Sequence, residues 1–112
     1  MTVEILPSAW EGLARIQYDV RARFGEDTAF KVTNRILDAL ERLERFPDSG
    51  TMTPDSWLND MGFRMVVSDK RNLAIYRRIE DHVYVYIIAD TRTEYAKVFK
   101  GMIFDDPGIV LH

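Results

Sequence analysis

Apolar residues recur every three to four positions over the first third of the chain, the spacing of one face of a helix. The pattern predicts a first helix from Ser8, which stands at capping-box distance from Glu11, to a C-terminal cap at Gly25. A second helix follows, with Asp27 as its N-cap, and ends at Phe46-Pro47. The two apolar stripes consist of Trp10, Leu13, Ile16, Val20 and Phe24, and of Phe30, Thr33, Ile36, Leu37, Leu40 and Leu43. Because only a short turn separates the helices, we expect an antiparallel helical hairpin.

Runs with strand character stand on both sides of this hairpin. Val3 to Leu6 precedes it and stops at Pro7. After a polar stretch from Asp48 to Asp60, interpreted as a loop, three strand-like runs follow: Phe63 to Ser68, Leu73 to Ile79, and Val83 to Ala89. Short turns join them, which predicts an antiparallel meander. Regular alternation in the last run divides its side chains between two faces, with Val83, Val85 and Ile87 on one and Tyr84, Tyr86 and Ile88 on the other.

A final amphipathic helix is expected after Arg92, with Thr93 as its cap. Its apolar positions fall at i, i+3, i+4, i+7 and i+8 and are Tyr95, Val98, Phe99, Met102 and Ile103. The resulting order β-α-α-β-β-β-α describes an α+β fold, a small antiparallel sheet packed on an N-terminal α-helical hairpin. We expect a single domain over residues 1–100, followed by a tail over 101–112 that frays or extends the last helix.

The composition excludes several classes of protein. Hydrophobic residues at 46% and charged residues at 29% of the 112 positions are ordinary for one globular domain and exclude disordered and fibrous chains. The chain has no cysteine, which excludes disulfide frameworks and thiolate chemistry. The first ten residues lack the pattern of a signal peptide, and the longest apolar run is too short to cross a bilayer. We therefore expect a cytoplasmic protein that does not bind membranes.

The charge is unevenly distributed. The net charge of the chain is −3, yet residues 61–100 carry eight Lys/Arg against five Asp/Glu. Tyrosines interleave with this basic stretch, and arginine and tyrosine together can clamp a phosphate, stack on a base or move a proton. Solvent-facing strand residues explain the same pattern, and residue types alone favour that simpler explanation. There is no phosphate-binding loop, dinucleotide fingerprint or metal-binding motif, and His82 falls in a predicted turn, so no cofactor or metal is expected.

The order of these pieces resembles the RelE/ParE superfamily of toxins from bacterial type II toxin–antitoxin systems. The resemblance runs from Val3 to about Phe99. It is carried by VEILPSAWEGLARI (3–16), LERFPDSG (43–50), GFR (62–64), LAIYRRI (73–79) and VYVYIIADTRTEY (83–95). It implies a short sheet packed on a helical hairpin. It also implies a cognate antitoxin as partner. We expect the antitoxin, or a helix that it displaces, on the last helix and on the outward Tyr84/Tyr86/Ile88 face; equally, the last helix would simply complete the core.

The superfamily has two branches with different targets. RelE-like members cut mRNA on the ribosome without metal, by activating the ribose 2′-hydroxyl. By that resemblance, the catalytic residues would be Arg64, Arg92 and Tyr95. Arg64 matches the arginine that opens the central strand, Arg92 would stabilise charge on the phosphate, and Tyr95 would act as general base or acid. ParE-like members instead inhibit DNA gyrase and need no catalytic residues. Lysines that RelE-like members carry ahead of the central strand are missing between Thr51 and Asp60.

Both targets remain open at this point. We expect a toxin neutralised by its antitoxin and acting as a ribosome-dependent mRNA endoribonuclease. The alternatives are a gyrase inhibitor and a decayed toxin that only binds its antitoxin.

Overall fold

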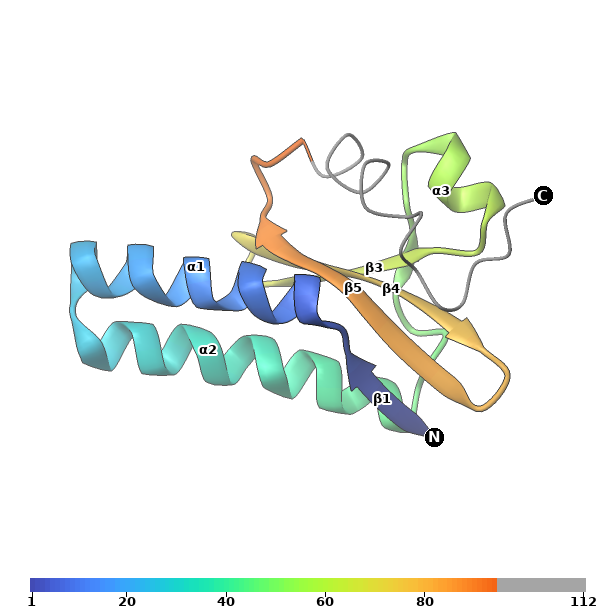
Figure 1. The fold of residues 1–112 in the computed structure, drawn as a ribbon, viewed down its shortest axis with the longest axis horizontal. Coiled ribbons are helices and arrows are strands. Elements are labelled where there is room, and N and C mark those ends of the chain that lie inside the picture. Colours follow the sequence, from blue (N-terminus) through green and yellow to red (C-terminus); the bar gives the residue numbers. More distant parts are fainter. Residues whose placement is uncertain (95–112) are drawn as a thin grey trace.

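A computed structural model describes residues 1–94 of the chain (Figure 1). The predicted last helix, Tyr95 and the predicted tail lie outside the described residues. The elements are β1 (Thr2–Ile5), α1 (Pro7–Phe24), α2 (Glu26–Glu41), a short 3₁₀ helix η1 (Arg42–Glu44), β2 (Thr51–Met52), α3 (Ser56–Asp60), β3 (Arg64–Ser68), β4 (Asn72–Ile79) and β5 (His82–Asp90). The stretch from Asp48 to Asp60, predicted as a loop, therefore contains a short strand and a short helix.

The helices α1 and α2 form the predicted antiparallel hairpin. Gly25 joins them with φ of 92°, a backbone conformation that favours glycine, so the predicted cap of α1 is confirmed. The two predicted N-caps are wrong. The first helix begins at Pro7, whose missing N–H costs nothing in the first turn, and the Ser8 hydroxyl instead donates to the Tyr86 carbonyl oxygen at 2.7 Å. The second begins at Glu26, so Asp27 lies inside its first turn, where a carboxylate favours the helix dipole.

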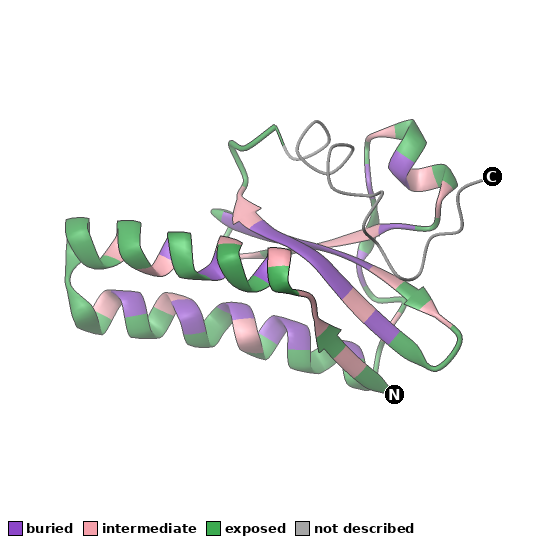
Figure 2. Ribbon diagram, in the orientation of Figure 1, coloured by how far each residue is buried: buried purple, intermediate pink, exposed green. Residues whose placement is uncertain are grey.

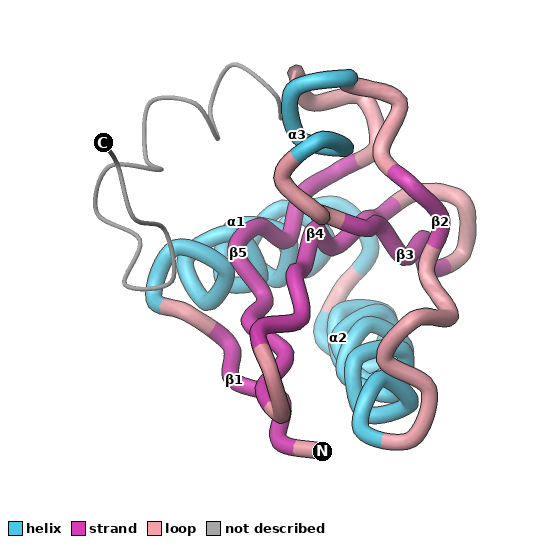
Figure 3. The backbone as a smooth tube through the Cα atoms, turned by 90° about the vertical axis from the view of Figure 1, so that its right-hand side faces the viewer, coloured by secondary structure: helices cyan, strands magenta, loops and turns pink. Residues whose placement is uncertain are grey.

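Five strands form one sheet in the order β1-β5-β4-β3-β2. The antiparallel meander of β3, β4 and β5 is confirmed. The sheet is nevertheless mixed, because β1 pairs with β5 in parallel, from Thr2 opposite His82 to Ile5 opposite Val85. This pairing places the start of the chain at the sheet edge nearest α1, as Figure 3 shows from the side.

A β-bulge in β5 changes which side chains face the helices. Ile75 pairs with Ile87, but the next residue, Tyr76, pairs with Val85, so Tyr86 is the extra residue. The predicted alternation is therefore wrong beyond the bulge. Ile88 joins Val83 and Val85 in the core cluster against the hairpin, whereas Ile87 packs with Tyr86 on the opposite face.

The sheet thus separates two apolar clusters. In Figure 2, buried residues, in purple, lie along the central strands and on the helices at either side of the sheet. The hairpin covers one face and buries Leu13, Ile16, Ile36 and Leu40 there, together with Leu43 from η1. On the other face, Leu58 from α3 packs with Phe63 and strand residues. The ends of the predicted helix stripes are exposed instead of buried: Trp10 at 49%, Phe24 at 60% and Phe30 at 70%.

Candidate functional site

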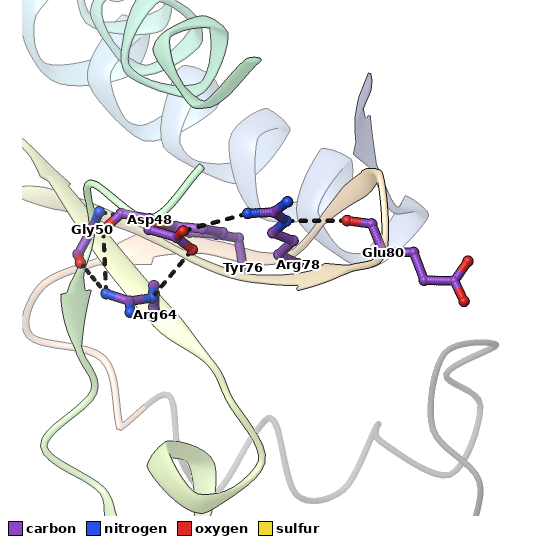
Figure 4. A network of polar contacts seen from close by, with 6 residues as sticks. All are labelled: Asp48, Gly50, Arg64, Tyr76, Arg78 and Glu80. Carbon is purple, nitrogen blue, oxygen red and sulfur yellow. Dashed lines mark hydrogen bonds and ion pairs between the residues drawn. The ribbon is translucent and has the colours of Figure 1, made fainter. Parts of the chain in front are cut away.

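Arg64, the first predicted site residue, opens β3 and lies in a network of polar contacts (Figure 4). Its Nη1 donates to the carbonyl oxygens of Asp48 at 3.3 Å and Gly50 at 3.0 Å, and its Nε lies 4.0 Å from the Asp48 carboxylate. Arg78, from β4, reaches the other oxygen of the same carboxylate at 3.4 Å. Two guanidinium groups therefore flank one carboxylate, and both hold the chain that leads into β2.

Tyr76 supports this network from inside the core. The ring is fully buried, and its hydroxyl accepts a hydrogen bond from the Gly50 N–H at 2.9 Å. Burial raises the pKa of the Tyr76 hydroxyl, against smaller lowering effects of the Gly50 hydrogen bond and the Arg64 charge. The Tyr76 hydroxyl therefore stays neutral, and its contact with the Gly50 N–H positions the backbone ahead of β2.

Arg92, the second predicted site residue, follows the end of β5. Its Nε and Nη2 donate to the two carboxylate oxygens of Asp90, at 3.0 and 3.1 Å, and its backbone N–H donates to the same carboxylate at 2.8 Å. These hydrogen bonds are the main reason why the pKa of Asp90 lies below its ordinary value, and the charge of Arg23 contributes in the same direction. The Arg92 side chain is 82% exposed.

The strand register separates the two arginines. Arg64 pairs with Tyr76, whereas Asn72, at the opposite end of β4, pairs with both Ser68 and Asp90. The four residue steps from Arg64 to Ser68 alone span about 13 Å. Arg64 and Arg92 thus lie at opposite ends of the central strands, each held by its own aspartate, and the structure does not bring the predicted site together. The third predicted residue, Tyr95, lies outside the described residues.

The end of the sheet that carries Arg92 also carries a cleft of about 510 Å³. It lies between the hairpin, the β3–β4 turn and the end of β5, and is lined by Ile16, Asp19, Val20, Arg23, Phe24, Thr28, Val32, Arg71, Asn72, Asp90, Thr91 and Arg92. The sequence analysis assigned no site role to Arg23 or Arg71, and Arg71 is only one of the eight Lys/Arg counted over residues 61–100. No spacing signal could have joined these two residues with Arg92, because the three come from α1, the β3–β4 turn and the end of β5.

Within residues 1–94, no group of three or more His, Asp or Glu side chains is placed to hold a metal ion. None of the helices in this part of the chain is both long and apolar enough to cross a membrane.

Comparisons with known proteins give the family. The family described as "ParE toxin of type II toxin-antitoxin system, parDE" matches residues 3–101. No curated protein matches the chain. Among solved structures, one titled "Chromosomal ParDE TA system from P. aeruginosa" is similar, with a TM-score of 0.69 and 18% identity, over 80% of this chain and 95% of that one. This likeness shows the shared fold, and the family match covers most of the sequence. The chain therefore belongs to the ParE family of toxins of type II toxin–antitoxin systems.

Proposed function

We propose that this toxin acts without catalysis, by binding DNA gyrase and inhibiting it in the cytoplasm, and that a cognate antitoxin neutralises it. The antitoxin follows from the family of toxin–antitoxin systems to which the chain belongs. Gyrase is the target that the resemblance to ParE-like members implies.

The separation of Arg64 from Arg92 is the observation that carries this proposal. Metal-independent RNA cleavage needs charged groups and a proton acceptor around one phosphate, within hydrogen-bond reach of the reacting atoms. Here Arg64 is bound to Asp48 and Gly50, and Arg92 to Asp90, at opposite ends of the strands. A toxin that works through binding alone has no need to bring these groups together.

One observation favours the endoribonuclease expected from the sequence. Arg92 shares its cleft with Arg23 and Arg71. The guanidinium groups of Arg23 and Arg71, beside the Asp90-bound Arg92, could hold the phosphates of an mRNA, because arginine binds phosphate by charge and by forked hydrogen bonds. This second function would use a different set of arginines from the one predicted.

Two assays on the purified protein separate the functions. In the first, gyrase supercoils a relaxed plasmid in the presence of increasing amounts of toxin. In the second, a defined mRNA is translated in a cell-free reaction with the toxin, and new 5′ ends are mapped. We expect supercoiling to be inhibited and the mRNA to stay intact. Normal supercoiling at saturating toxin, with new 5′ ends that need ribosomes, would establish the nuclease instead.

A further inference from the structure

The cleft beside Arg92 exists because the hairpin is longer than the part of the sheet it covers. In Figure 1 the joined ends of α1 and α2 extend well past the ends of β4 and β5. Side chains on the inner side of this overhang lack strands beneath them. They form the floor of the 510 Å³ cleft together with the residues that end β5.

The floor of the cleft is apolar. Val20 and Val32 are half-buried and pack at the margin of the core, and Phe24, at the end of α1, is 60% exposed. An exposed aromatic ring beside two valines offers contact area to a bulky apolar side chain, which gains free energy by leaving water.

The rim of the cleft has an excess of positive charge. It carries Arg23, Arg71 and Arg92 against Asp19 and Asp90, and Arg92 and Asp90 neutralise each other. Within the described residues, no hydrogen bond or ion pair holds the guanidinium of Arg23 or Arg71. The charge of Arg23 acts on Asp90 and lowers the pKa of that carboxyl, but within residues 1–94 no such bond holds either guanidinium, so both can pair with carboxylates of a partner that occupies the cleft.

We propose that this cleft is the surface through which the toxin binds its target, and that it takes a protein segment with a bulky apolar side chain between carboxylates. The apolar side chain packs on Phe24, Val20 and Val32, and the carboxylates pair with Arg23 and Arg71. The apolar floor favours a protein segment over RNA, because a base could stack on Phe24 but the polar ribose-phosphate backbone offers Val20 and Val32 no apolar contact. The inference rests on the proposed function, because a toxin without catalysis acts only through its binding surface.

The other arginine cluster offers no such surface. Arg64 and Arg78 are already engaged by Asp48 and by backbone carbonyl oxygens. A partner carboxylate there would have to displace contacts that hold the chain before β2.

The test reverses the charge of two arginines at the rim of the cleft. The effect is compared with that of reversing two arginines on the surface outside the cleft. The variant R23E/R71E changes two cleft arginines, and the control R15E/R42E changes two exposed arginines outside the cleft by the same charge. Each is assayed for inhibition of gyrase supercoiling, for binding to purified gyrase, and for binding to a fluorescein-labelled 12-nucleotide RNA. Circular dichroism and a urea midpoint confirm that each variant is folded.

We expect R23E/R71E to need at least tenfold more toxin for half-inhibition and the control to stay within about twofold of the unchanged protein. Phe24→Ala, at an exposed position, should weaken inhibition severalfold in the same assay. These results together support the cleft as the target-binding surface.

Several results would overturn the inference. Equal inhibition by R23E/R71E and the unchanged protein would place the binding surface elsewhere, and equal loss in both charge variants would show a general charge effect. Loss of RNA binding in R23E/R71E with unchanged inhibition would make the cleft a nucleic-acid site. If the unchanged protein does not inhibit gyrase at all, both the proposed function and this inference fail. Measuring the unchanged protein by itself distinguishes that outcome from a failure of this inference alone.

Discussion

The Tyr76 hydroxyl joins two segments that are distant in the sequence, because it accepts a hydrogen bond from the Gly50 N–H in the core. Tyr76→Phe removes this acceptor and leaves a buried N–H without a partner. We expect a loss of about 1–3 kcal/mol in the free energy of unfolding, measured by urea denaturation. Tyr18→Phe, at a ring that is 70% exposed, is the control and should change stability by less than about 0.5 kcal/mol. Equal effects of the two substitutions would contradict the role of the Gly50 contact.

The pairing of Asp90 with Arg92 predicts how the stability of the fold depends on pH. The folded-state pKa of Asp90 lies below its ordinary value, so its pairing with Arg92 stabilises the fold above the unfolded aspartate pKa of about 3.9. This contribution is lost as the pH falls through the folded value. Arg92→Gln should therefore raise the pKa of Asp90, as followed by NMR titration of its carboxyl carbon. The stability difference between the two proteins should disappear at pH values below the folded pKa. An unchanged Asp90 midpoint would show that Arg92 is not the cause.

The contact between α1 and β5 depends on one small residue. A Cβ added to Gly12 would overlap the backbone carbonyl oxygen of Ile88, which cannot move aside as a flexible side chain could. At an exposed helix position, glycine to alanine stabilises a protein by about 1 kcal/mol. At this contact we expect Gly12→Ala to destabilise the protein by about 1–3 kcal/mol, because the helix is forced away from the strand.

Urea denaturation checks the sign of this change. Ala14→Gly, at an exposed position of the same helix, calibrates the helix propensity and should cost about 1 kcal/mol. Greater stability of Gly12→Ala would mean that α1 and β5 do not approach each other as closely as the structure shows. The prediction thus tests the packing of an element, independently of the toxin's activity.

The distance between the two ends of the sheet bears on the toxin as a whole. If the toxin acts through the cleft near Arg92, Arg64 lies too far away to contribute to binding. The amount of the Arg64→Ala variant needed for half-inhibition of gyrase should then lie within about twofold of that of the unchanged protein, counted as folded toxin. A catalytic arginine would behave differently, because its removal lowers a rate by about 10²–10³. A loss of that size in the supercoiling or mRNA assay would restore Arg64 to the functional site.

Local patterns were sufficient for most of the fold. The three-to-four-residue spacing of apolar positions predicted the hairpin, and the alternating runs with short turns predicted β3, β4 and β5. Predictions failed where a tertiary contact replaced a local one. The Ser8 hydroxyl bonds to the Tyr86 carbonyl oxygen instead of capping its own helix, and the β-bulge at Tyr86 turns Ile88 toward the hairpin. Neither contact leaves a periodic signal, since each joins residues from different elements.

By itself, the sequence determined the class of this protein: the hairpin, the meander and their order follow from burial periods and turn residues, and its motifs matched the right toxin superfamily. The sequence also identified Arg64 and Arg92 as candidate site residues. Only the tertiary structure decided which arginines lie together, because strand register and the overhang of the hairpin set these distances. Arg64 therefore lies at one end of the sheet, and Arg92 lies with Arg23 and Arg71 at the other. The physical reason is that periodicity reports which face of an element is buried, whereas a site forms where separate elements end.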